Sequence, residues 1–94
     1  MRDFQKPERS EVFSSNGMIA TSHPLAAKIG LDSMSKGGNA IDAAITAAIM
    51  LVLCEPQSTG LFGDAFAILK SKKAKGIIGL NGSGKAPMAL TSDT

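Results

Sequence analysis

The longest apolar stretch of the chain predicts one helix from Ala40 to about Cys54. Alanine, isoleucine, leucine and valine occupy nearly all of its faces, which is typical of a helix that is buried on every side or lies in a membrane. The stretch has about 15 residues, fewer than the roughly 20 that span a bilayer. We therefore expect no membrane span, and the central helix of a packed layer. Asn39 caps its start, Asp42 completes a short-armed capping box, and Pro56 follows its end.

A second helix is predicted ahead of it, from Pro24 to about Lys36. Proline suits the first helical position, where its missing amide costs nothing. Gly37 suits the C-terminal cap and makes a tight junction between the two helices. Residues 18–21 form a short apolar run after a turn signal, which predicts a brief strand. The residues predicted to face inward from this helix are Leu25, Ala26, Ile29 and Met34.

The rest of the chain predicts a β-hairpin between two glycine-containing loops. Residues 65–69 and 77–80 are apolar runs, and a lysine-rich turn joins them. Both faces of the first run are apolar, so we expect a sheet that is covered on both sides. Loops at residues 57–64 and 81–87 precede and follow the hairpin. The predicted fold class is α+β, two adjacent helices followed by a β-hairpin.

The composition indicates too little material to bury such a helix. The chain has 94 residues, with four Phe and no Trp or Tyr, so few large side chains are available to surround it. One small domain is possible, but the mismatch favours a fragment of a larger protein. The net charge of +2 is spread out, and the lysines within residues 70–75 are typical of a solvated turn. We expect no nucleic-acid partner.

Cysteine and histidine occur once each, at Cys54 and His23. A single cysteine excludes an internal disulfide, and one of each cannot form a structural zinc site, so neither metal nor cofactor is predicted. We expect Cys54 to be a buried, unreactive thiol and His23 to serve at a helix start. Residues 1–16 form a polar N-terminal leader without the apolar run of a secretory signal, which predicts a cytoplasmic location.

The two glycine loops are the candidate sites. Residues 79–86 read G-L-N-G-S-G-K-A and match the phosphate-binding pattern G-x-x-x-x-G-K up to its last position. Ala86 has no hydroxyl for magnesium and Pro87 follows it, so a turn after a strand is favoured over nucleotide binding. Residues 58–64 could line a site through exposed backbone amides, or could connect a helix to a strand. The sequence leaves both possibilities open.

Six short motifs also follow one another along the chain. They are G-M-I-A at 17–20, H-P-L-A at 23–26, G-G-N-A-I-D-A-A at 37–44, E-P at 55–56, S-T-G at 58–60 and G-D-A-F at 63–66. Each is short, but the ordered set at this spacing is specific. It resembles the start of the γ-glutamyltransferases, also called γ-glutamyl transpeptidases or glutathione hydrolases. The resemblance covers about residues 17–91.

This resemblance implies the N-terminal-nucleophile hydrolase fold, an αββα sandwich of two sheets between helical layers. Members are precursors that cleave themselves into a large and a small subunit. The N-terminal Thr of the small subunit takes a γ-glutamyl group from a glutathione-like donor and passes it to water or an amino acid. Residues 17–94 would begin the large subunit, with the small subunit of the same precursor as partner. No catalytic residue is then expected in this chain, because Thr21, Thr91 and Thr94 lack the nucleophile's context.

One loop departs from the transpeptidases proper, which carry an Arg for the donor's α-carboxylate in a D-G-R-E-x-A-P motif. Here residues 81–87 read N-G-S-G-K-A-P, with Ser83 at the Arg position. This wording resembles a γ-glutamyltransferase-like branch related to the cephalosporin acylases. Ser83, Gly84 and Lys85 are the residues predicted to line the substrate pocket. An ammonium does not reproduce the bidentate grip of a guanidinium, so other acyl amides are plausible donors beside γ-glutamyl compounds.

Two alternatives stay open at this point. The first is a free-standing small module that binds an anionic ligand with its two glycine loops and has no catalytic activity. The second is a truncated, inactive relative that retains only assembly contacts.

Overall fold

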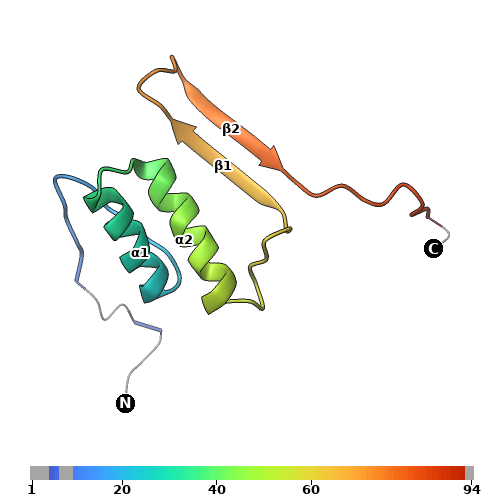
Figure 1. Cartoon of the computed structure of the whole chain (residues 1–94), viewed down its shortest axis with the longest axis horizontal. Helices are drawn as coiled ribbons and strands as arrows, with labels where there is room; N and C mark the ends of the chain where they lie inside the picture. Colours follow the sequence, from blue (N-terminus) through green and yellow to red (C-terminus); the bar gives the residue numbers. More distant parts are fainter. Residues whose placement is uncertain (1–4, 7–9, 93–94) are drawn as a thin grey trace. The chain divides into compact units, whose positions relative to one another are not determined.

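The computed structural model describes residues 5–6 and 10–92, which form two compact units. The first unit ends at Cys54 and holds two helices, and the second begins at Glu55 and holds two strands. The elements in chain order are α1 (Pro24–Ser35), α2 (Ala40–Cys54), β1 (Ala65–Lys70) and β2 (Ile77–Gly82) (Figure 1). Both predicted helices and the predicted hairpin are confirmed. The predicted leader at residues 1–16 lies only partly within the described residues.

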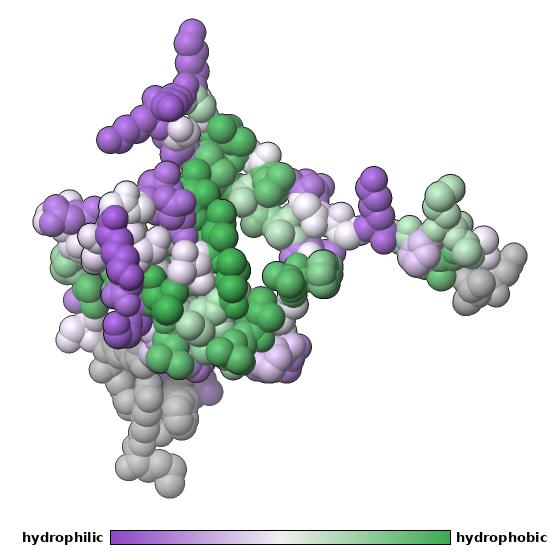
Figure 2. All heavy atoms as spheres, viewed as in Figure 1, coloured by the Kyte–Doolittle hydropathy of each residue, from purple (hydrophilic) through white to green (hydrophobic). Residues whose placement is uncertain are grey.

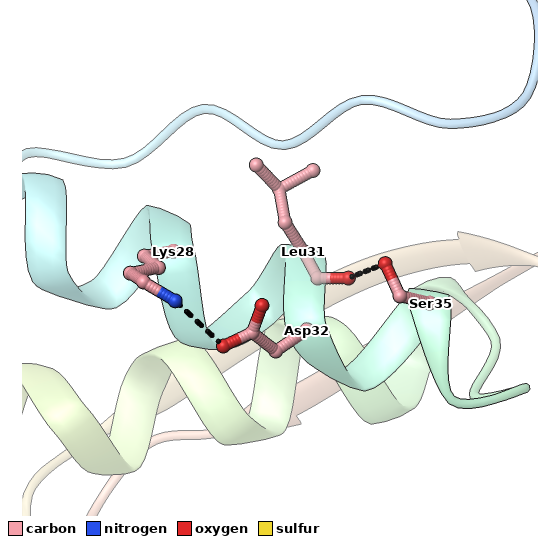
Figure 3. Close-up of polar contacts among 4 residues, drawn as sticks. All are labelled: Lys28, Leu31, Asp32 and Ser35. Carbon is pink, nitrogen blue, oxygen red and sulfur yellow. Dashed lines mark hydrogen bonds and ion pairs between the residues drawn. The ribbon is translucent and has the colours of Figure 1, made fainter.

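The start of α1 is capped by His23, as expected. Its Nδ1 accepts a hydrogen bond from the Leu25 N–H at 3.2 Å, and Pro24 occupies the first helical position. On the exposed side of the helix, Lys28 Nζ lies 3.1 Å from Asp32 Oδ2, one turn further on (Figure 3). Such an exposed i,i+4 pair contributes at most roughly 0.3 kcal/mol here, because the lysine precedes the acid, which is the less favourable order.

The junction between the helices depends on the glycine pair at 37–38. Gly37 has φ +99°, the left-handed region that a residue with a Cβ rarely adopts. Its N–H donates to the Met34 carbonyl at 3.1 Å, and the Gly38 N–H donates to the Ser33 carbonyl at 2.9 Å. These two bonds form a Schellman motif, which satisfies carbonyls left free at the end of α1.

The predicted capping box at the start of α2 is confirmed. The Asn39 N–H donates to Asp42 Oδ2 and the Asp42 N–H donates to Asn39 Oδ1, both at 2.9 Å. Each side chain thus satisfies a backbone donor that has no partner inside the helix. The Asp42 carboxylate also lies at the positive end of the helix dipole. The start of α2 is therefore encoded within four consecutive residues.

The two helices run side by side in opposite directions and meet through small residues (Figure 1). The buried positions are Ala26 and Gly30 on α1 and Ala43 and Ala47 on α2. Because their side chains are small, the two backbones can approach closely. The predicted inward face of α1 is wrong at Leu25, which is 54% exposed. Leu25 lies about 100° around the helix from Ala26, so it is off the line of Ala26 and Gly30 along which the helices meet.

The prediction that α2 is buried on every side is wrong for this chain. Large apolar residues spaced four apart remain 40–78% exposed, namely Ile41, Ile45, Ile49 and Leu53. Figure 2 shows apolar atoms gathered over this helix. The physical reason is that the described part of the first unit offers one other helix, and one helix covers only one side of another. In the described residues, no helix has the length and apolar character needed to cross a membrane.

Residues 18–21 do not form the predicted strand. They run irregularly beside α1, with Ile19 half-buried. A β-strand needs a neighbour for its backbone hydrogen bonds. Among the described residues, the strands that pair are β1 and β2, and they pair with each other.

The hairpin is antiparallel, and its register pairs Ala65 with Gly82 and Lys70 with Ile77. Its strands extend one and two residues beyond the predicted ends. The expectation that both faces are covered is wrong for this chain, since Phe66 is 69% and Ile68 83% exposed. The described second unit contains no further strand or helix that could cover a face.

Candidate functional site

The two glycine loops meet at the open end of the hairpin. In the register, Ala65 at the start of β1 lies opposite Gly82 at the end of β2. Asp64 therefore immediately precedes, and Ser83 immediately follows, the last pair of the ladder. This brings the loop before the hairpin next to the loop that contains the predicted substrate residues.

A hydrogen bond between Asp64 and Gly84 links these loops. Asp64 Oδ1 accepts from the Gly84 N–H at 2.7 Å, across 20 residues of sequence. Bonds to an ionised acceptor are short and about twice as strong as neutral ones. A Cβ on residue 84 would lie only 2.8 Å from the same oxygen. Glycine at this position allows the carboxylate to approach the backbone closely.

A second side chain holds the neighbouring amide. Asn81 Oδ1 accepts from the Ser83 N–H at 3.1 Å, a local turn that asparagine commonly makes. Both amides are therefore engaged by acceptors of the protein itself. The Gly84 N–H, which could otherwise bind a phosphate oxygen, is held by the Asp64 carboxylate, which is itself an anion. This arrangement agrees with a turn after a strand, not a nucleotide site.

Ser83 and Lys85 are left as the polar side chains that the loop presents to solvent. Every residue from 81 to 87 is exposed. Within the described part of the chain, Lys85 has no ion-pair partner. A hydroxyl and an ammonium two residues apart can bind a carboxylate or polarise a carbonyl. The assignment of Ser83, Gly84 and Lys85 to a substrate pocket stays a prediction.

The loop at residues 58–64 is largely a connection. The N–H groups of Ser58 and Thr59 donate to the Glu55 carbonyl at 3.1 and 3.0 Å, which closes the last turn after α2. The Gly63 N–H donates to the Gly60 carbonyl at 3.4 Å. Of the two interpretations of this loop, the connecting role fits better. Its contribution to the site is Asp64, the last residue of this candidate loop, whose partner the sequence did not identify.

The other candidate residues have local roles or lie apart. His23 uses its ring nitrogen to cap α1, as expected. Cys54 is half-buried, not buried, because the last turn of α2 is covered on one side only. Thr94 lies outside the described residues. Groups of three or more His, Cys, Asp or Glu that could hold a metal ion do not occur among the residues that the structure describes.

Comparison with known proteins identifies the relatives of this chain. The sequence pattern of the family described as Gamma-glutamyltranspeptidase matches residues 26–94. The chain is 41% identical over 78 residues to a glutathione hydrolase proenzyme of Bacillus subtilis. The aligned region covers 83% of the chain and 13% of that protein. It is 31% identical over 86 residues to the acylase ACY 1 proenzyme of a Pseudomonas species, covering 92% of the chain and 15% of that protein.

Solved structures agree with these sequence matches. The crystal structure of a γ-glutamyltranspeptidase from Helicobacter pylori superimposes with a TM-score of 0.78 at 32% identity. The superposition covers 87% of this chain and 23% of that chain. Two helices followed by an antiparallel hairpin therefore form part of that larger fold. The chain spans 13–15% of the length of the two relatives named above.

Proposed function

Because this chain belongs to the γ-glutamyltranspeptidase family, we propose that it is the beginning of the large subunit of a γ-glutamyltransferase-like proenzyme. The complete protein would transfer or hydrolyse a γ-glutamyl or related acyl group. An N-terminal Thr of the small subunit, outside this chain, would be the nucleophile and carry the acyl group. The 94 residues alone would have no activity.

The match of residues 26–94 to the family carries this proposal. The chain also covers only a small part of its relatives, 13% of the Bacillus subtilis protein. The uncovered surfaces of both units support it. In this chain α2 exposes a row of large apolar side chains, and the hairpin exposes apolar residues on both faces. Burying such surface stabilises a protein by about 25 cal/mol per Å². The remaining layers of an αββα sandwich would provide that burial.

We further propose that Ser83, Gly84 and Lys85 line the acyl-donor side of the pocket. Lys85 would attract the donor's carboxylate as a point charge. Because an ammonium lacks the paired donors of an arginine, the grip on an α-carboxylate would be looser. The sequence of this loop resembles that of the acylase-like members, which supports other acyl amides as donors beside γ-glutamyl compounds.

The test is to express the complete reading frame and determine the intact masses and N-terminal sequences of its products. The proposal expects two chains, one of them beginning with Thr. Three p-nitroanilides then separate the donor's features. The γ-glutamyl compound has a carboxylate and an amine, the glutaryl compound has the carboxylate alone, and the butanoyl compound has neither. One unprocessed species that turns over none of them would contradict the proposal and favour an inactive relative.

A further inference from the structure

We infer that Asp64 is the positioning residue for the loop that presents Ser83 and Lys85 to the acyl donor. This inference rests on the proposed function, because it assigns a role within the same site. Asp64 is not among the residues predicted to touch the substrate. Its effect would be transmitted through the backbone of Gly84.

The bond between Asp64 and Gly84 lies just beyond the last pair of the hairpin. The ladder of β1 and β2 ends with the pair Ala65 and Gly82. Beyond that pair, the chain after Gly82 would be free to move without a further anchor. The Asp64 carboxylate supplies that anchor, since its Oδ1 holds the Gly84 N–H at 2.7 Å. The Asp64 side chain thus adds one hydrogen bond beyond the last backbone pair of the two strands.

Two successive amides of the loop are held by two different side chains. Asn81 Oδ1 holds the Ser83 N–H at 3.1 Å, and Asp64 Oδ1 holds the next amide along the chain. Two adjacent anchors restrict the rotation of the backbone between them. The direction in which the chain enters Lys85 is set by the same bonds. Because a lysine side chain is flexible, the position of its Cα sets the region that the ammonium can reach.

The Asp64 carboxylate fits closely against the backbone at Gly84. A methyl group there would lie 2.8 Å from Asp64 Oδ1, nearer than real Cβ atoms come to such a neighbour. The carboxylate and the missing side chain at position 84 are therefore matched to each other. By contrast, Gly79 in the middle of β2 has no atom within 4 Å of the corresponding position. The tight fit belongs to the loop end of the hairpin.

A consequence for the ligand follows from these bonds. The Ser83 and Gly84 amides already have acceptors, so a donor's carboxylate would have to bind the side chains of this loop. The expected recognition is thus one hydroxyl and one ammonium whose positions depend on Asp64. We expect a loss of Asp64 to weaken binding of a carboxylate-bearing donor while leaving the chemical step little changed.

The experiment uses the processed full-length protein and the glutaryl and butanoyl p-nitroanilides. Asp64→Ala should raise KM for the glutaryl donor about tenfold, the size expected for loss of a charged hydrogen bond. The kcat for that donor and the KM for the butanoyl donor should change less than about threefold. Asp64→Asn keeps an acceptor oxygen and should recover most of the loss. Equal KM changes for both donors, or no rescue by asparagine, would overturn the inference.

A double-mutant cycle separates this role from general loosening of the hairpin. Gly84→Ala should raise KM for the glutaryl donor strongly when Asp64 is present, because the methyl displaces the carboxylate. In the Asp64→Ala background the same change should add less than about twofold, since the two residues act as a unit. Additive effects would count against the pairing. Gly79→Ala is the matched control and should leave KM unchanged.

Hydrogen exchange of the peptide containing residues 83–87 gives a readout that needs no activity. Asp64→Ala should speed exchange of the Gly84 amide about tenfold or more, and Asp64→Asn should not. If the unsubstituted protein is neither processed nor active, the proposed function fails while this exchange result still tests the role of Asp64. Unchanged exchange in Asp64→Ala, with normal processing, would overturn the role of Asp64 alone.

Discussion

The side chain of Ile19 occupies the space that any side chain at position 30 would need. A Cβ built on Gly30 would overlap Ile19 Cδ1 and would lie 3.3 Å from the Ala43 carbonyl oxygen. Gly30 is buried in α1, so this is the place where α1, α2 and the segment before α1 come into contact. The segment before α1 and the two helices pack together here because Gly30 has no side chain.

Gly30→Ala should therefore lower the free energy of unfolding by about 1–2 kcal/mol, because overpacking outweighs the better helix propensity of alanine. Ile19→Val removes the Cδ1 atom that the methyl would meet. In that background Gly30→Ala should cost less, and urea unfolding of the natively expressed protein measures the difference. Strictly additive effects of the two changes would show that Ile19 and Gly30 are not coupled.

The capping box of α2 predicts a similar loss. Asn39→Ala should lower the free energy of unfolding by about 1 kcal/mol, since an amide of the first turn loses its acceptor. Asp42→Ala should cost a comparable amount, and the double variant less than the sum, because the two bonds are reciprocal. The control is Ser35→Ala. The Ser35 hydroxyl donates to the Leu31 carbonyl on the exposed surface of α1 (Figure 3). The free energy of unfolding should therefore change by less than about 0.5 kcal/mol.

The left-handed conformation of Gly37 predicts a backbone effect. Gly37→Ala should lower the melting temperature, with a loss of about 1 kcal/mol, because a Cβ strains the φ of +99°. Asparagine tolerates this region better, so Gly37→Asn should cost less. Gly76→Ala is the matched control, since Gly76 also has open space around it but, unlike Gly37, does not have a positive φ. Equal losses at both positions would argue against conformational strain.

The exposed row on α2 predicts opposite effects in two samples. Ile45→Lys with Ile49→Lys should raise the solubility of the 94-residue chain, where these residues are 55% and 59% exposed. In the full-length protein the same pair should cost several kcal/mol, because an unpaired charge would be buried. Soluble yield and thermal unfolding measure the two effects. Unchanged stability of the full-length protein would mean that this side of α2 stays uncovered.

The charge of Lys85 predicts a change in substrate binding. Lys85→Ala in the full-length protein should raise KM for the glutaryl donor about fivefold to tenfold, through loss of a charge-assisted contact. The KM of the butanoyl donor should be unaffected. Lys73→Ala is the matched control, because it removes an equal charge from the turn at the other end of the hairpin. Unchanged KM for the glutaryl donor would remove Lys85 from the site.

Much of the local structure could be predicted because its determinants are close in sequence. The His23 cap, the Gly37 turn and the reciprocal bonds of Asn39 and Asp42 each involve residues within a few positions of one another. The hairpin was predicted from two apolar runs around a lysine-rich turn. The family was identified from ordered motifs, which preserve spacing even where single residues change.

The candidate site could be predicted only in part. The loop at residues 81–87 was found through its resemblance to a family motif, but the pairing of Asp64 with Gly84 was not. A carboxylate between a glycine and the start of a strand was a visible signal. The partner of Asp64 could not be named, because it depends on the register of β1 and β2, which the sequence pattern does not give.

The positions of α1, α2 and the two hairpin strands, and the caps of the helices, follow from interactions between residues close in the chain. The covering of their surfaces depends on tertiary packing instead. Ala43 and Ala47 are buried while Ile45 and Ile49 on the same helix are exposed, because the contacts available to α2 in its unit come from one side. Hydrophobicity states what a side chain would gain from burial, whereas the arrangement of distant segments decides whether burial occurs.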